Sequence, residues 1–224
     1  MGTNQPPSAL GSSTIAQQAF QQAQARYTQY KEEISKMDSG ATAKDDQLRK
    51  FMFRECAVLK SIGKLQQDLN AYQLRNKTLS DDNLEDEAEL GKNTNSAHLH
   101  KNLTANGEIK PGRHWQAHHI ICSRHETHYD SRYAMFAYGI GINDPVNGAW
   151  LPRKNADAKG STLPKAVGHR YIHTNAYATF IQNKVTSAMS EQHLKMVLGA
   201  IQTELQNVSP AVKALLTAKG KADL

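Results

Sequence analysis

Apolar residues recur with helical spacing over the first third of the chain. One set lies three or four positions apart: Phe20, Ala23, Tyr27, Tyr30, Ile34 and Met37. A second set lies near one face of a stretch from Asp45 to Asn76: Leu48, Met52, Leu59, Ile62, Leu69 and Tyr72. Because Ser39-Gly40 separates the two sets, the pattern predicts a pair of helices forming a helical hairpin.

The hairpin carries no pattern of chemically reactive residues, and two interpretations of it stay open. It is either a small core that braces the molecule or a docking surface for a carrier or partner, and a single sequence does not separate the two. The dozen residues ahead of it are rich in Pro, Ser and Gly, a composition typical of disorder.

A polar, acidic stretch between Lys77 and Asn95 is typical of a solvated helix or linker. It contains the runs Asp81-Asp82 and Glu85-Asp86-Glu87. We therefore predict two domains, a helical module over residues 1–93 that includes this linker and a second domain over residues 94–224.

The second domain mixes helical and strand patterns. Helices are expected near 96–106, 132–136, 169–189 and 191–206, and strands at 116–123 and 149–151. Turn residues fill 107–112, a loop spans 139–148, and an exposed basic loop is expected over 152–168. The fold class that follows is α+β, mostly helical, with a small strand element.

The net positive charge is confined to the second part of the chain. Residues 1–96 hold 12 Lys and Arg against 13 Asp and Glu, and residues 97–224 hold 15 against 8, a net charge of +7 (15 minus 8). This excess favours a polyanionic partner, although many basic domains bind no nucleic acid. Cys56 and Cys122 are too few for a disulfide framework. The polar start and the lack of a long apolar run predict neither signal-peptide export nor membrane insertion.

Histidine is concentrated around one region. Seven of the ten histidines lie within 60 residues: His114, His118, His119, His125, His128, His169 and His173. His169 and His173 are four positions apart, so on a helix both could reach one cation, although an isolated pair is more often a solvated helix face. On a strand, the adjacent side chains of His118 and His119 point to opposite sides and therefore cannot have the same chemical role.

Such a division of labour suits phosphodiester hydrolysis. That reaction needs a base to activate water and a cation to stabilise charge on the phosphate, and a metal-bound histidine cannot be the base. A neutral histidine beside the metal can act as base when a hydrogen bond to its other ring nitrogen fixes the tautomer. Asn147 in the intervening loop is a candidate for that orienting role.

The region Leu99 to Val185 resembles the HNH, or ββα-metal, endonucleases, and within them the AHH branch named after its Ala-His-His motif. The motif here is Ala117-His118-His119, followed by the run Gly141-Ile-Asn-Asp-Pro-Val-Asn-Gly-Ala-Trp-Leu-Pro152 and then by a histidine-bearing segment. The resemblance implies His119 as general base, Asn147 as the asparagine that positions it, and His118 and His173 as metal ligands. By similarity to colicin-type DNases, His169 is a third ligand.

One departure leaves the ligand set open, because His173-Thr-Asn-Ala-Tyr177 stands where we expect a His-Pro-x-Tyr-Asn run. The resemblance implies a ββα-metal core that holds one divalent cation (Mg²⁺, Mn²⁺ or Zn²⁺) and cuts DNA, or alternatively RNA, with little sequence specificity. AHH domains are largely toxin modules of bacterial competition. That setting implies an effector made in the bacterial cytoplasm, delivered by a secretion-system carrier through the N-terminal helices, acting in the target-cell cytoplasm, and countered by a cognate immunity protein.

The remaining residues receive a plainer interpretation. Basic residues that are candidates for phosphate contact, but singly are more typical of a solvated surface, are Arg113, Arg124, Arg153, Lys154, Lys165 and Arg170. His98, His100 and His193 are expected to face solvent or to lie behind the site, whereas the direction of His114, His125 and His128 is open. Trp115 and Trp150 are expected in the core.

Two rival functions follow from the same residues. In the first, four histidines hold a structural zinc and the basic face only binds nucleic acid, because a filled four-ligand site leaves no position for substrate. In the second, the N-terminal helices carry an adaptor or delivery function and the nuclease is vestigial. The presence of both His119 and Asn147 argues against such decay.

Overall fold

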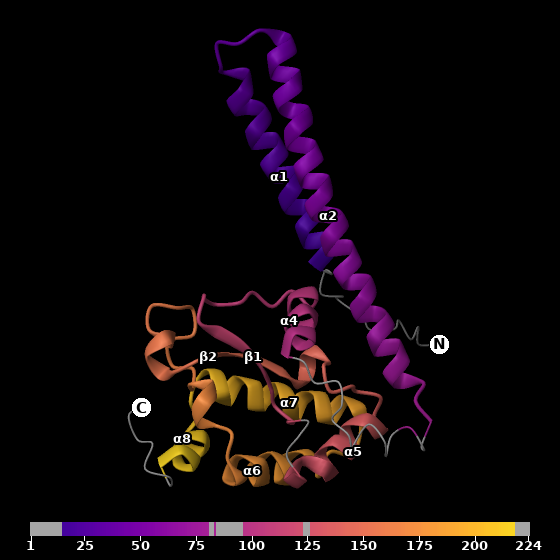
Figure 1. Ribbon diagram of the computed structural model, residues 1–224, viewed down its shortest axis with the longest axis vertical. Coiled ribbons are helices and arrows are strands. Elements are labelled where there is room, and N and C mark those ends of the chain that lie inside the picture. The colour runs from indigo at the N-terminus through magenta and orange to yellow at the C-terminus, as the bar shows by residue number, and fades with distance from the viewer. Residues whose placement is uncertain (1–14, 81–82, 84–95, 123–125, 218–224) are drawn as a thin grey trace, which may run out of the picture. The chain divides into compact units, whose positions relative to one another are not determined.

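The computed structural model describes residues 15–80, 83, 96–122 and 126–217. The chain divides into two compact units, Met1–Gln66 and Gln67–Leu224, shown in Figure 1. The predicted domain boundary near residue 94 and most of the acidic stretch lie outside the described residues, as do the first dozen residues, Arg124 and His125. The predictions made for them stay predictions.

The first unit contains helix α1 (Ile15–Ser35) and most of helix α2 (Ala41–Lys77), as the apolar spacing predicts. The Tyr30 ring stacks on Phe51 with centroids 4.5 Å apart, and Arg26 pairs with Glu55 at 2.6 Å. Several apolar side chains stay about half exposed or more, among them Phe20, Met37, Met52 and Phe53. The last turns of α2, from Gln67 onward, belong to the second unit.

The second unit is mostly helical with one two-stranded antiparallel sheet, consistent with the predicted α+β class (Figure 1). After the end of α2, its described residues form the α-helices and strands α4 (Ser96–Ala105), β1 (Trp115–His119), α5 (Tyr129–Ala137), β2 (Gly148–Pro152), α6 (Asn175–Val185), α7 (Glu191–Gln206) and α8 (Pro210–Thr217). Short 3-10 turns occupy Glu126–His128, Pro145–Asn147, Asn155–Ala158 and His169–Tyr171. Of the helices in the described part of the chain, none is long and apolar enough to cross a membrane.

The register of the two strands assigns their side chains to faces. His118 lies opposite Ala149 and His119 opposite Gly148, and paired residues share a face of the sheet. Ala149 belongs to the core cluster that includes α6 and α7, whereas a side chain on Gly148 would meet Leu99 and Leu103 of α4. His118 therefore faces the α6 and α7 side, and His119 faces the α4 side, as strand alternation predicts.

Strand β1 ends at His119, whereas the sequence predicts a strand that continues to Ser123. That prediction is wrong for the described residues 120–122. Ile120 and Ile121 are fully buried, but their backbone does not continue the ladder. The Ile120 amide donates to the Asn147 backbone oxygen at 2.8 Å, and the Ile121 amide donates to Oδ1 of Asn147 at 2.8 Å. An apolar run of this kind predicts a buried segment, but it does not show whether that segment pairs as a strand. Here the hydrogen bonds to Asn147 replace those to a partner strand.

The single helix predicted from His169 to Met189 is also wrong. A 3-10 turn covers His169–Tyr171, and α6 begins only at Asn175 and ends at Val185. The break falls at Thr174, whose extended backbone and side-chain hydroxyl cap α6 by accepting a hydrogen bond from the Tyr177 amide at 3.1 Å. His173 precedes this cap, so His169 and His173 do not share one face of a continuous helix.

Candidate active site

Three histidines come together in the second unit. One ring nitrogen from each of His118, His169 and His173 lies within 4.8 Å of the others. Their ring centroids are 4.7 to 5.4 Å apart. They come from β1, from the 3-10 turn and from the residue before the α6 cap, and the sequence predicted all three as metal ligands. The turn before α6 brings His169 and His173 together in place of the expected helix face.

Hydrogen bonds assign the ring nitrogen that His118 offers. Its Nε2 lies 3.2 Å from the Tyr177 hydroxyl, and that hydroxyl donates its only proton to the Ile120 carbonyl at 3.3 Å. With the hydroxyl proton on that carbonyl, the hydroxyl accepts from Nε2–H, and the lone pair of His118 is on Nδ1. That Nδ1 is buried and has no hydrogen-bond partner. A buried imidazole lone pair without a partner fits a metal ligand.

His169 is oriented in a similar way by a residue that sequence reasoning missed. Its Nδ1 donates to Oε1 of Gln116 at 2.8 Å, so its lone pair is on Nε2, 2.9 Å from Nε2 of His173. An acceptor behind a ligating imidazole fixes its tautomer and ring direction. Gln116 is two residues before His118 on β1, and strand alternation could have placed it on the same face.

Electrostatics keep the imidazoles of His118 and His169 neutral. Burial lowers the pKa of His118 well below its ordinary value, and the neighbouring His169 and His173 add to the effect. Burial, then His173 and His119, lower the pKa of His169 to about 4. Because a histidine must be deprotonated to bind a metal, these two residues are ready to bind a cation at neutral pH.

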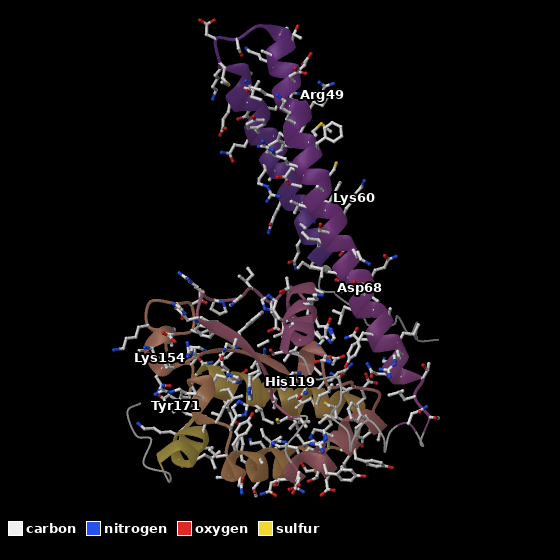
Figure 2. The ribbon with its side chains drawn as sticks, in the orientation of Figure 1. Arg49, Lys60, Asp68, His119, Lys154 and Tyr171 are labelled. Atoms are coloured by element: carbon white, nitrogen blue, oxygen red, sulfur yellow. The ribbon has the colours of Figure 1, made fainter. Side chains whose placement is uncertain are left out.

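His119 makes a different hydrogen bond on the other face of β1. Its Nε2 donates to Oδ1 of Asn143 at 3.0 Å, which leaves Nδ1 as the basic nitrogen. Burial lowers the pKa of His119, and the hydrogen bond to Asn143 opposes this shift. Figure 2 shows His119 among the elements of the second unit, with Lys154 at its periphery. A neutral, oriented histidine beside a candidate cation site can accept a proton from water.

The orienting hydrogen bond expected from Asn147 is thus made by Asn143. Asn147 is fully buried and its amide reaches backbone atoms: Oδ1 accepts from the Ile121 amide at 2.8 Å, and Nδ2 donates to the carbonyls of Ile121 at 3.2 Å and Ile142 at 2.8 Å. It ties the end of β1 to the loop before β2. Both asparagines lie in the run from Gly141 to Pro152 that resembles the nuclease family. The sequence of this run does not show which of the two side-chain amides contacts the imidazole of His119.

The predicted phosphate contacts lie on the surface. Arg113, Arg153, Lys154, Lys165 and Arg170 are all exposed. The Arg170 guanidinium lies over the Tyr171 ring, 4.7 Å from its centroid, and Lys165 lines a cleft of about 510 Å³ together with Lys159 and Lys213. Their role toward phosphate stays a prediction.

Other aromatic residues mostly follow their plainer interpretation. Trp115 and Trp150 are buried in the core, as predicted. His98 and His100 are exposed, and the His100 ring meets the Trp150 ring edge-on at 4.9 Å. His128 is buried beside Tyr177, with ring centroids 6.4 Å apart, so it lies behind the three-histidine cluster.

A comparison with family models matches residues 99–211 to a nuclease family of the HNH/ENDO VII superfamily with conserved AHH. The matched range is 113 of the 224 residues, half of the chain. It contains the three-histidine cluster, His119 and both asparagines. No match was found among the curated proteins or among the solved structures.

Proposed function

The chain belongs to the AHH nuclease family of the HNH/ENDO VII superfamily, and from this premise we propose that it is a metal-dependent endonuclease that hydrolyses phosphodiester bonds of DNA. The family implies nuclease activity, and the superfamily's nucleases use a divalent metal. The observation that carries the metal dependence is the cluster of His118, His169 and His173, with the buried lone pair on Nδ1 of His118.

One divalent cation would be held by Nδ1 of His118, Nε2 of His169 and a ring nitrogen of His173. When bound, such a cation stabilises negative charge on the phosphate and on the leaving oxygen. Within the described residues the cluster consists of three side chains. Three protein ligands leave a position for substrate, whereas a structural zinc is enclosed by four, so the cluster favours catalysis over the structural-zinc alternative.

In this proposal His119 is the general base. Its Nδ1 takes a proton from the attacking water, while Oδ1 of Asn143 accepts from Nε2–H and holds the ring in the productive tautomer. The same hydrogen bond becomes charge-assisted when the ring is protonated, so Asn143 also stabilises the imidazolium that forms. Burial keeps the resting imidazole neutral by lowering its pKa.

The preference for DNA rests on the family resemblance, and the lack of sequence specificity rests on charge and size. Residues 97–224 carry a net charge of +7 (15 minus 8), which suits phosphate contacts that are blind to sequence. The sheet has only two strands of five residues each, which offers little surface for contacts to base edges.

The biological setting is a further part of the proposal and rests on the family resemblance. The protein would be an antagonistic effector delivered into a target cell through its N-terminal helices, and an immunity protein would protect the producer. Soluble wild-type protein should then halt the growth of a bacterial host unless a neighbouring partner is co-expressed. Unhindered growth would refute this setting.

The central test is degradation of plasmid DNA and of total RNA by the purified chain, with and without EDTA. We expect loss of plasmid in Mg²⁺, Mn²⁺ or Zn²⁺, arrest in excess EDTA, and recovery when metal is added back. Full cleavage in EDTA would refute the metal dependence. Tight zinc without cleavage would support the structural-zinc alternative, and degradation of RNA alone would overturn the substrate.

A further inference from the structure

We propose that the C-terminal end of α2 is a positioning element for the catalytic histidine, acting through Tyr72 on Asn143. This inference rests on the proposed function of His119. Tyr72 belongs to the same compact unit as the histidines but precedes residues 99–211, the range matched by the nuclease family. The base is thereby held by a part of the chain that the family match does not include.

Asn143 is fixed at three points. Its backbone amide donates to the Tyr72 hydroxyl at 2.8 Å, and its backbone carbonyl accepts from Nδ2 of Asn102, on α4, at 2.8 Å. Its side-chain Oδ1 accepts from His119. Two helices therefore hold the backbone on either side of the carbon that carries the orienting amide. Removal of either hold would let that amide shift relative to the imidazole.

The close approach of α2 to this loop is built into two glycines. A Cβ on Gly141 would overlap the Tyr72 hydroxyl and the Asn76 amide. A Cβ on Gly139, whose φ is +69°, would lie 3.1 Å from Cα of Lys77. A larger residue at either position would push the loop away from the helix. Glycine at both positions therefore allows the loop backbone to approach α2 closely.

A second hydrogen bond from the same helical turn holds the next residue. Nε2 of Gln73 donates to Oδ2 of Asp144 at 3.0 Å, while Oδ1 of Asp144 accepts from the Val146 amide at 3.0 Å and caps the 3-10 turn that ends at Asn147. Burial raises the pKa of Asp144, and both hydrogen bonds oppose that shift. Tyr72 and Gln73 thus fix two consecutive residues of the loop that carries the orienting amide.

The test is the kinetics of Tyr72→Phe in the full chain, with plasmid DNA as substrate. Loss of the hydroxyl should lower kcat by about tenfold, while KM and bound metal stay unchanged, because small misplacements at a reacting centre affect chemistry more than binding. The matched control is Tyr138→Phe, which also removes a partly buried tyrosine hydroxyl that is hydrogen-bonded to the backbone. The Tyr138 hydroxyl donates to the Ala188 carbonyl at 3.2 Å. This control should cost similar stability and leave kcat unchanged.

A double variant separates positioning from a general loss of structure. If Tyr72 acts through Asn143, adding Tyr72→Phe to Asn143→Ala should change kcat by less than about twofold, whereas independent effects would multiply. Asn143→Asp keeps an acceptor for His119 and should retain most of the activity that Asn143→Ala loses. Equal kcat for Tyr72→Phe and Tyr138→Phe, or multiplying losses in the double variant, would overturn the inference while leaving the nuclease assignment intact. A wild-type chain that cuts no nucleic acid would refute the proposed function and this inference with it.

Discussion

Two asparagines in the loop before β2 show how residues of one type can differ in what they hold. Asn143 places its amide oxygen on the imidazole of His119, and Asn147 places its amide on three backbone atoms of Ile121 and Ile142. The first can act on the chemistry directly. The second fixes the chain that follows the catalytic histidine, so the two substitutions should have different effects.

Asn147→Ala should mainly cost stability. It removes three hydrogen bonds and leaves buried amide and carbonyl groups of Ile121 and Ile142 without that partner, a loss of about 2–4 kcal/mol in the free energy of unfolding. Urea denaturation followed by circular dichroism measures it. Asn143→Ala is the comparison, and it should lower kcat by about 100-fold with a smaller change in stability. The distinction fails if the two variants unfold at the same urea concentration.

The adjacent histidines should separate chemistry from metal binding. His119→Ala removes the base and should lower the cleavage rate by about 10² to 10⁴ while the metal stays bound. His118→Ala and His173→Ala remove ligands, so they should weaken metal affinity, and raised metal concentration should restore part of their activity. Metal content and plasmid cleavage are measured on the same preparations. Loss of metal from His119→Ala, or near wild-type cutting by it, would contradict these roles.

At the scale of elements, the sequence predicts helices well where a long apolar face and a capping residue agree. Helix α7 spans Glu191–Gln206 as predicted, and Ser190 caps it. The errors occur where one side chain replaces a regular partner, as Asn147 does at the end of β1 and Thr174 does ahead of α6. The three histidines of the cluster were nevertheless predicted together despite both errors. The order of the motifs identifies these residues, whereas tertiary contacts determine how their side chains are arranged.

The contribution of Glu108 to the free energy of unfolding is expected to fall as pH rises, because its carboxyl is largely buried. Glu108 follows α4 and accepts from Nε2 of Gln202, on α7, at 3.1 Å, and burial raises its pKa from 4.5 to about 7 despite hydrogen bonds from Asn106 and Gln202. A raised pKa means that the folded state binds the proton more tightly. Its contribution to stability is therefore fully present below about pH 4.5 and is lost as pH rises through about 7.

Glu108→Gln should remove this dependence. Because other groups titrate too, the quantity to measure is the difference in unfolding free energy between wild type and variant. From pH 5 to pH 8 that difference should move against the wild type by about 1 kcal/mol, a figure reduced for the partial exposure of the carboxyl. A difference that stays constant across this range would show that Glu108 does not titrate with folding.

At the scale of the whole molecule, charge and connectivity are distributed unevenly. Residues 97–224 carry the entire positive excess, while residues 1–96 have a net charge of −1 (12 minus 13). Yet α2 contributes residues to both compact units, and its last turns hold the loop of the catalytic site. The net positive charge therefore lies in the part of the chain that is expected to contact the substrate. Its boundary does not coincide with the boundary between the two compact units.

The cleft of about 510 Å³ lined by Lys159 and Lys165 is where this charge should act on the substrate. Changing both residues to Glu should weaken binding of duplex DNA at low salt by at least about tenfold. It should also reduce the slope of log affinity against log salt by roughly 0.9 for each phosphate that the protein no longer neutralises. The control changes Lys36 and Lys60 to Glu, which alters the net charge equally but lies among residues 1–96. Binding is measured by fluorescence anisotropy on the inactive His119→Ala background. If the control lowers affinity and slope as much as the cleft variant, the net charge and not this cleft determines binding.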